Sequence, residues 1–225
     1  MNAVGIFETM RVREGGIPLL DRHLHRLAHG AAAVGLPRPS AVVRTIALER
    51  AAEGPADRIL RLAWSRDGTA WTERPLGPKV PQRLVTVRVP HRGYTVKSED
   101  RQVFDRAHAE AQIAGGTEPV LLTEEGVVAE TARYAVLWMD GPVLCYPAAD
   151  LGVLPSIGLG RVLELAAGLG MATGAVRAPR WALNGRPAWL VNAVRGLVRI
   201  ASLDGEDVPA SDALREVAKS FWPAA

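Results

Sequence analysis

Three glycine-containing turns, each placed between two short apolar runs, most constrain the fold of this chain. They lie at residues 14–16, 124–126 and 140–141. Short apolar runs on both sides of such turns are typical of β-hairpins. Between the hairpins, apolar residues recur at helical spacing, for example over residues 20–35 and 40–54. Interleaved hairpins and helices predict an α+β fold.

A change in pattern near Pro90 divides the chain. Before it, a strand and two helices precede further strands; after it come a helix, two hairpins, a second helix, further strand and a closing helix. This order predicts two α+β lobes, a small one over residues 1–90 and a large one over residues 91–225 that carries Lys97. The predicted helices would begin at the N-cap residues Asp21, Ser40 and Ser98.

The composition describes an ordinary soluble protein and argues against several classes of function. Of the 225 residues, 48% are hydrophobic and 23% charged, and no apolar run approaches the roughly 18 residues that cross a bilayer. We therefore expect no membrane association. The start of the chain has neither a basic leader nor a long apolar stretch, and its single cysteine, Cys145, suits a reducing compartment. These features favour a cytoplasmic protein without a signal peptide.

The charge pattern favours a small anionic substrate over nucleic acid. The net charge is +3, but the basic residues are dispersed and form no block or aromatic-basic platform. His25 and His29 lie one helical turn apart and could in principle hold a metal ion. No nearby cysteine or glutamate completes a ligand set, so we expect no metal site.

Lysine is rare in this chain, and one lysine has notable neighbours. Of the 27 basic residues only Lys79, Lys97 and Lys219 are lysines. Unlike arginine, lysine can lose its proton and act as a nucleophile or base. Lys97 falls in a loop between the predicted lobes, and Glu130 ends an apolar strand, where an unpaired buried carboxylate would be costly. On composition alone, a coding bias toward arginine is the simpler explanation of the scarcity.

Two further features suit the binding of a phosphate. Arg26 lies beside the apolar stripe of the first helix, and small residues stand at a helix start in "PSIGLGR", where free backbone N–H groups attract anions. An amine, a carboxylate, an arginine and an anion-binding helix terminus are the groups needed to hold pyridoxal phosphate. Each of these groups also has an ordinary structural interpretation.

Several segments, in the same order, resemble the fold-type IV pyridoxal phosphate enzymes, also called class IV aminotransferases. That family includes branched-chain and D-amino acid aminotransferases and 4-amino-4-deoxychorismate lyase. The resemblance runs from about Gly5 to Asp204. The matching segments are "GIFETMRVREGGIPLLDRHLHRL", "VKSEDR", "EPVLLTEEGVVAET", "GVLPSIGLGRVLELA" and "WLVNAVRGLVRIASLDG".

The resemblance implies a role for each residue of a cofactor site. Lys97 would form the Schiff base with pyridoxal 5'-phosphate and move the proton in catalysis, and Glu130 would face the pyridine nitrogen. The remaining residues would bind the cofactor phosphate: Arg26, Ile157, Gly158, Asn192 and Ala193. The first strand would turn Phe7 and Thr9 toward the substrate. The family also implies a two-lobed enzyme that forms a homodimer, here with a shortened small lobe.

Three functions remain open within this resemblance. Arg101 and the Asn192-Ala193 pair look more like the lyase branch, which converts 4-amino-4-deoxychorismate to 4-aminobenzoate and pyruvate in folate biosynthesis. An aminotransferase acting on branched-chain or D-amino acids would use the same lysine and glutamate. Ala135 and Gly158 depart from the family pattern, since they stand where asparagine and threonine are usual. These departures motivate the third possibility, a non-catalytic binding protein.

Overall fold

The computed structural model describes residues 5–223. The sequence predicts an opening strand over residues 4–12, and its first residue, Val4, lies outside the described residues. The chain divides into two compact units, and neither of them is one continuous segment. The first unit comprises Met1–Pro78, Val96–Asp100 and Trp222–Ala225, and the second comprises Lys79–Thr95 and Arg101–Phe221.

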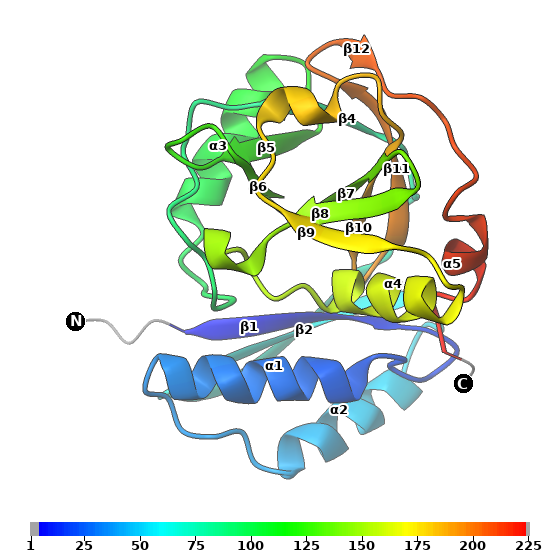
Figure 1. The fold of residues 1–225 in the computed structure, drawn as a ribbon. Coiled ribbons are helices and arrows are strands. Elements are labelled where there is room, and N and C mark those ends of the chain that lie inside the picture. The colour runs from blue at the N-terminus through cyan, green and yellow to red at the C-terminus, as the bar shows by residue number, and fades with distance from the viewer. Residues whose placement is uncertain (1–4, 224–225) are drawn as a thin grey trace. The chain divides into compact units, whose positions relative to one another are not determined.

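The first unit is built on a three-stranded antiparallel sheet. The strands, in spatial order, are β1 (Ile6–Val12), β2 (Arg58–Ser65) and β3 (Gly68–Pro75). Two helices lie along the sheet, α1 (Leu20–Ala33) and α2 (Val42–Ala52) (Figure 1). The turn after β1 closes through paired hydrogen bonds between Arg13 and Gly16, as the hairpin pattern predicts.

The alternating direction of the side chains along β1 determines which residues of the strand face the helices. Ile6, Met10 and Val12 belong to the core that α1 and α2 complete, with the buried side chains of Leu27 and Ala31. Successive side chains of a strand point to opposite faces. Even-numbered positions of β1 therefore face the helices, and odd-numbered positions such as Phe7 and Thr9 face away from them.

The short segment Val96–Asp100 binds the edge of β1 that β2 leaves open. The amide of Phe7 donates to the carbonyl of Lys97 at 2.9 Å, and the amide of Glu99 donates to the carbonyl of Gly5 at 2.8 Å. Ser98 forms an isolated antiparallel bridge with Ile6. These bonds attach the backbone of Lys97 directly to the strand that carries Phe7.

The second unit contains a nine-stranded mixed sheet with helices outside it (Figure 1). Along the main path the spatial order of its strands is β6-β5-β4-β11-β10-β7-β8-β9, and β12 pairs with β11. The strands are β4 (Gln82–Thr86), β5 (Glu118–Leu122), β6 (Val128–Thr131), β7 (Ala135–Asp140), β8 (Val143–Pro147), β9 (Thr173–Val176), β10 (Ala188–Asn192), β11 (Gly196–Leu203) and β12 (Glu206–Asp207). The helices are α3 (Gln102–Ile113), α4 (Ile157–Gly168) and α5 (Arg215–Lys219), with the 3-10 turns η1 (Ala149–Leu151) and η2 (Arg180–Leu183).

Helix α3 covers one part of this sheet. Its buried residues Phe104, Ala107 and Ala111 pack with Val87 and Leu121. A second cluster fills the curled sheet itself, and Trp138 is its largest fully buried side chain. The observed mixture of helices and strands confirms the predicted α+β fold.

The division into units differs from the predicted lobe boundary in two respects. The first long segment ends at Pro78 rather than near Pro90, and Val96–Asp100, which carries Lys97, groups with the first unit. The grouping follows from the hydrogen bonds that attach Val96–Asp100 to β1.

The three predicted N-caps are wrong. Helices α1, α2 and α3 begin after Leu19, Ala41 and Arg101, and none of these three residues makes a side-chain capping bond. Asp21 lies inside the first turn of α1 and pairs with Arg44 instead. Ser98 belongs to the segment bound to β1, and its hydroxyl accepts from the amide of Asp100 at 3.0 Å.

Candidate functional site

Lys97 lies beside the outward face of β1. Its Nζ is 4.7 Å from the centroid of the Phe7 ring, and the guanidinium carbon of Arg61 is 3.7 Å from the same centroid. Phe7 is 5% exposed, and Thr9 on the same face is half-buried. The first unit thus places the predicted lysine next to one of the two predicted substrate residues. Two cations near one aromatic face make this face suitable for an anion.

The opposite face of β1 holds a buried ion cluster of Glu8, His23 and Arg26. The guanidinium of Arg26 donates to both carboxylate oxygens of Glu8, from Nε at 2.8 Å and from Nη2 at 2.7 Å. His23 Nδ1 lies 2.7 Å from Glu8 Oε2. Glu8 and His23 are each 1% exposed. The cluster joins β1 to α1 through a geometry in which charged hydrogen bonds are strong.

The electrostatics of this cluster favour an ionised Glu8 and a neutral His23. Burial alone would raise the pKa of Glu8, but the charge and hydrogen bonds of Arg26, with the hydrogen bond of His23, lower it to about 2. Burial lowers the pKa of His23, and the hydrogen bond to Glu8 opposes that effect. A neutral His23 that donates Nδ1–H to Glu8 turns Nε2 into an acceptor. Within the described residues this buried Nε2 has no hydrogen-bond partner.

Arg26, the predicted phosphate ligand, is therefore held in place by a neighbouring carboxylate. A guanidinium has five N–H donors, and Glu8 takes two of them. The Arg26 side chain is 15% exposed. Its orientation is fixed by the pair with Glu8 before any ligand binds.

In the second unit, the side-chain carboxylate of Glu130 forms a buried hydrogen bond with a histidine. Glu130 lies on β6 opposite Leu121 of β5, and its Oε1 is 2.6 Å from Nε2 of His91. Glu130 is 7% and His91 is 5% exposed. The carboxylate that the sequence marked as costly to bury is thus satisfied by a partner 39 residues earlier in the chain.

Helix α4 begins with two unused backbone donors. Ser156 is its N-cap, and its hydroxyl accepts from the amide of Leu159 at 3.2 Å. Among the described residues no partner is recorded for the amides of Ile157 and Gly158, and both residues are buried. Free N–H groups at the positive end of a helix form a site suited to a phosphate.

The end of β10 contributes a third such donor. Asn192 uses its side chain to build the turn into β11: Oδ1 accepts from the amides of Val194 and Arg195 at 3.0 and 2.7 Å, and Nδ2 donates to the carbonyl of Arg133 at 3.1 Å. The amide of Ala193 has no recorded partner within residues 5–223. Asn192 can therefore serve a phosphate through its backbone and through the turn it stabilises.

Gly158 packs directly against this turn. A Cβ at position 158 would lie 2.7 Å from the carbonyl carbon and 2.8 Å from the Cα of Asn192, and 3.1 Å from the amide nitrogen of Ala193. Real Cβ atoms essentially never approach another atom as closely as the first two distances, and the third is tighter than most Cβ contacts. The absence of a threonine here thus has a packing reason, because only glycine lets the start of α4 approach Asn192 and Ala193 this closely.

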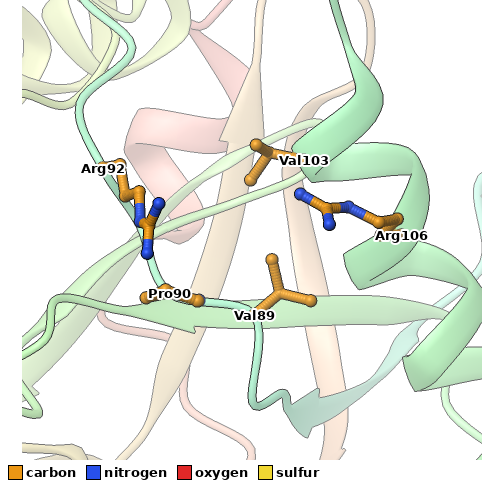
Figure 2. A pocket seen from close by; sticks show the side chains of 5 residues that line it. All are labelled: Val89, Pro90, Arg92, Val103 and Arg106. Atoms are coloured by element: carbon orange, nitrogen blue, oxygen red, sulfur yellow. The ribbon is translucent and has the colours of Figure 1, made fainter.

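The second unit also has a hollow of about 210 Å³, lined by Val89, Pro90, Arg92, Val103 and Arg106 (Figure 2). No predicted site residue lines it. Arg92 also lies 3.6 Å from Glu124 in an exposed ion pair.

The described residues contain neither a metal-ligand cluster nor a membrane-spanning helix. No group of three or more histidine, cysteine, aspartate or glutamate side chains within residues 5–223 could hold a metal ion. Across the described part of the chain, none of the helices combines the length and apolar character that a bilayer crossing needs.

The fold and these residues match one enzyme family. The model of the amino-transferase class IV family matches residues 5–203, so the chain belongs to this family of pyridoxal phosphate-dependent enzymes. The aminodeoxychorismate lyase of Bacillus subtilis is 22% identical over 89% of this chain and 78% of its own length. The bifunctional aminodeoxychorismate lyase / D-amino acid transaminase of Mycobacterium tuberculosis is 27% identical over 91% of this chain and 83% of its own length.

Solved structures confirm the fold-type IV architecture. A hypothetical aminotransferase from Mycobacterium tuberculosis, in its PLP-bound form, superposes with a TM-score of 0.84 at 23% identity, over 97% of this chain and 88% of that chain. The predicted family and fold class are confirmed, and so is the prediction of a pyridoxal phosphate-dependent enzyme.

Sequence reasoning missed three residues that the structure places beside the predicted ones. Glu8 and His23 surround Arg26, and His91 binds Glu130. The available signal for Glu8 was a carboxylate on the same face of the strand as the apolar residues Ile6, Met10 and Val12. His91 follows a proline in an irregular segment and carries no such signal.

Proposed function

We propose that this protein is an aminodeoxychorismate lyase, which converts 4-amino-4-deoxychorismate to 4-aminobenzoate and pyruvate. The observation that carries the proposal is that two curated relatives, matched over 89% and 91% of the chain, both have this activity in their names. Arg101 and the Asn192-Ala193 pair, which resemble the lyase branch, support the same choice.

The donor groups present fit pyridoxal phosphate. The proposed phosphate ligands are Arg26, held by Glu8, and the backbone at Ile157, Gly158, Asn192 and Ala193. Two observations support the backbone groups as ligands. Three of their amides have no hydrogen-bond partner within the described chain, and Gly158 packs closely against Asn192 and Ala193. A dianionic phosphate is the ligand that such N–H groups and a guanidinium bind best.

Lys97 and Glu130 are the proposed residues for the chemistry. Bound pyridoxal phosphate supplies an electron sink for the carbanion formed at the substrate. Lys97 holds the cofactor through Nζ and serves as the base that removes the proton from the substrate carbon bearing the amino group. Glu130, held by its hydrogen bond with His91, would face the pyridine nitrogen and keep it protonated. Phe7 and Thr9, on the β1 face beside Lys97, contact the substrate, whose carboxylates suit the cations near that face.

The first experiment tests cofactor and chemistry in one preparation. The purified protein is loaded with pyridoxal phosphate, reduced with borohydride and digested, and the modified residue is located by mass spectrometry. We expect the adduct on Lys97. Lys97→Arg keeps the charge but cannot attach the cofactor, so it should lose the adduct and the activity. Lys79→Arg, a matched change at an exposed lysine, should keep both.

The reaction itself is tested with aminodeoxychorismate prepared from chorismate. We expect 4-aminobenzoate by fluorescence and pyruvate through lactate dehydrogenase in equal amounts. A protein that binds the cofactor on Lys97 but forms neither product would refute the lyase assignment. Failure to bind pyridoxal phosphate at all would refute the cofactor site as well.

A D-amino acid aminotransferase is the second candidate. It is favoured by the name of the Mycobacterium tuberculosis relative, which joins lyase and D-amino acid transaminase activities. Lys97 would hold the cofactor and move the proton in that reaction as well, and the product would be a keto acid. D-alanine and 2-oxoglutarate, given to the same preparation, should yield pyruvate and glutamate if this activity is present. We also expect a homodimer from the family resemblance, which light scattering after gel filtration tests.

A further inference from the structure

His91 is held against Glu130 by the backbone of its own segment. The amide of His91 donates to the carbonyl of Leu122, at the end of β5, at 2.7 Å. Glu130 pairs with the neighbouring residue Leu121 from the other side of β5. Strand β5 therefore brings the histidine and the carboxylate together.

The geometry also fixes which nitrogen of His91 carries the proton. The amide of Gly93 donates to Nδ1 at 3.4 Å, so Nδ1 acts as an acceptor. The imidazole proton then lies on Nε2, which is 2.6 Å from Oε1 of Glu130. Gly93 has φ of +90°, a conformation that side chains rarely adopt, so this turn depends on glycine.

Only one of the two carboxylate oxygens is occupied in this arrangement. His91 takes Oε1, and Oε2 has no recorded partner within the described residues. This hydrogen bond orients the carboxylate of Glu130 and leaves its other oxygen available to another donor.

We propose that His91 is a positioning residue for Glu130: its Nε2–H holds Oε1, and Oε2 is the oxygen that accepts the pyridine N–H of the cofactor. This inference rests on the proposed function, since it requires pyridoxal phosphate to bind. It adds a residue that acts on the cofactor only through the carboxylate.

The test compares the binding of two cofactors by three proteins. The probes are pyridoxal phosphate and its 1-deaza analogue, in which a C–H replaces the pyridine nitrogen, and both are measured by equilibrium dialysis. The proteins are the wild type, His91→Phe, which removes the donor, and His91→Gln, whose amide restores one. Taking the ratio of the two Kd values cancels any general damage to the site, because both probes share the phosphate and the aldehyde.

We expect the wild type to prefer pyridoxal phosphate over the analogue, and His91→Phe to reduce this preference about tenfold. His91→Gln should restore most of it. In steady-state assays His91→Phe should lower kcat about tenfold with little change in KM, because the substrate contacts are untouched. Circular dichroism of the apoproteins checks folding, and His91→Leu replaces the phenylalanine variant if that variant does not fold.

The outcomes separate this inference from the proposed function. If the wild type binds pyridoxal phosphate but His91→Phe keeps the wild-type preference, His91 does not act through Glu130 and the inference is overturned. If the wild type binds neither probe, the proposed function fails and this inference fails with it. A preference lost in the phenylalanine variant and regained in the glutamine variant supports this inference and the cofactor site that it requires.

Discussion

Replacing Glu8 with glutamine should destabilise the folded apoprotein by about 3 to 4 kcal/mol at neutral pH. Glu8 is 1% exposed and accepts two hydrogen bonds from Arg26 and one from His23. Glutamine has nearly the same shape but no charge, so Arg26 would remain largely buried without its counter-ion. The change isolates the electrostatic contribution of one carboxylate in the first unit.

The magnitude follows from the pKa of Glu8, which falls from an ordinary value of 4.5 to about 2. The difference of about 2.5 pH units, at about 1.4 kcal/mol each, amounts to about 3 to 4 kcal/mol. Because the folded pKa is the lower one, this stabilisation is fully present above pH 4.5 and is lost as the pH falls toward 2.

Urea unfolding of the apoprotein, followed by circular dichroism, measures the effect. At pH 7 the variant should be about 3 to 4 kcal/mol less stable than the wild type. Glu49→Gln, a matched change at an exposed residue of α2, should stay within about 0.5 kcal/mol. A loss below about 1 kcal/mol in the Glu8 variant would show that the carboxylate of Glu8 is not held in the ionised form by Arg26.

The pH dependence needs a background in which His23 does not titrate. The pKa of His23 is lowered, so its protonation in the unfolded chain also removes stability as the pH falls below 6.5. His23→Asn keeps an amide donor for Glu8 and has no titration of its own. In that background the effect of Glu8→Gln should be constant from pH 7 to 5 and about 1 kcal/mol smaller at pH 3.5. A constant difference down to pH 3.5 would contradict the lowered pKa.

Three further predictions concern the second unit. Gly158→Ala places a methyl group 2.7 Å from the backbone of Asn192 and should weaken pyridoxal phosphate binding about tenfold or more by dialysis. Gly168→Ala in the same helix has open space and should leave binding unchanged. Ser156→Ala removes the N-cap of α4 and should cost about 1 kcal/mol in urea unfolding; no loss would mean that the cap contributes nothing. Burial raises the pKa of the Cys145 thiol, so a thiol reagent should label it slowly in the native protein and rapidly in urea, and equal rates would contradict its burial.

The local elements of the fold were predictable because their signals are local. The turns at residues 14–16, 124–126 and 140–141 each contain a glycine with positive φ, at Gly15, Gly126 and Gly141. Strand β9 was not predicted: its residues alternate between exposed and half-buried, and its pairing with β8 depends on the distant backbone. The return of Val96–Asp100 to β1 also depends on contacts distant in sequence, which no periodicity reports.

The candidate site also contains residues that the sequence predicts and residues that it does not. The positions of Lys97, Glu130 and Gly158 could be predicted because family resemblance marks each within its own motif. Their partners could not, since His91 meets Glu130 across 39 residues. Whether a buried carboxylate is unpaired or satisfied is a property of tertiary structure. The sequence therefore indicated the chemistry of the site but not the side chains that tune it.

The attachment of Val96–Asp100 to β1 limits how this protein can be cut and recombined. The chain passes from one unit to the other at Pro78, at Thr95, at Asp100 and at Phe221. A fragment ending at Pro78 would lack Lys97 and leave an edge of β1 open to pairing with other chains. Exchanging one unit with that of a relative would require at least two splices. In chimeric enzymes built from this protein and a relative, Val96–Asp100 and β1 should therefore come from the same parent.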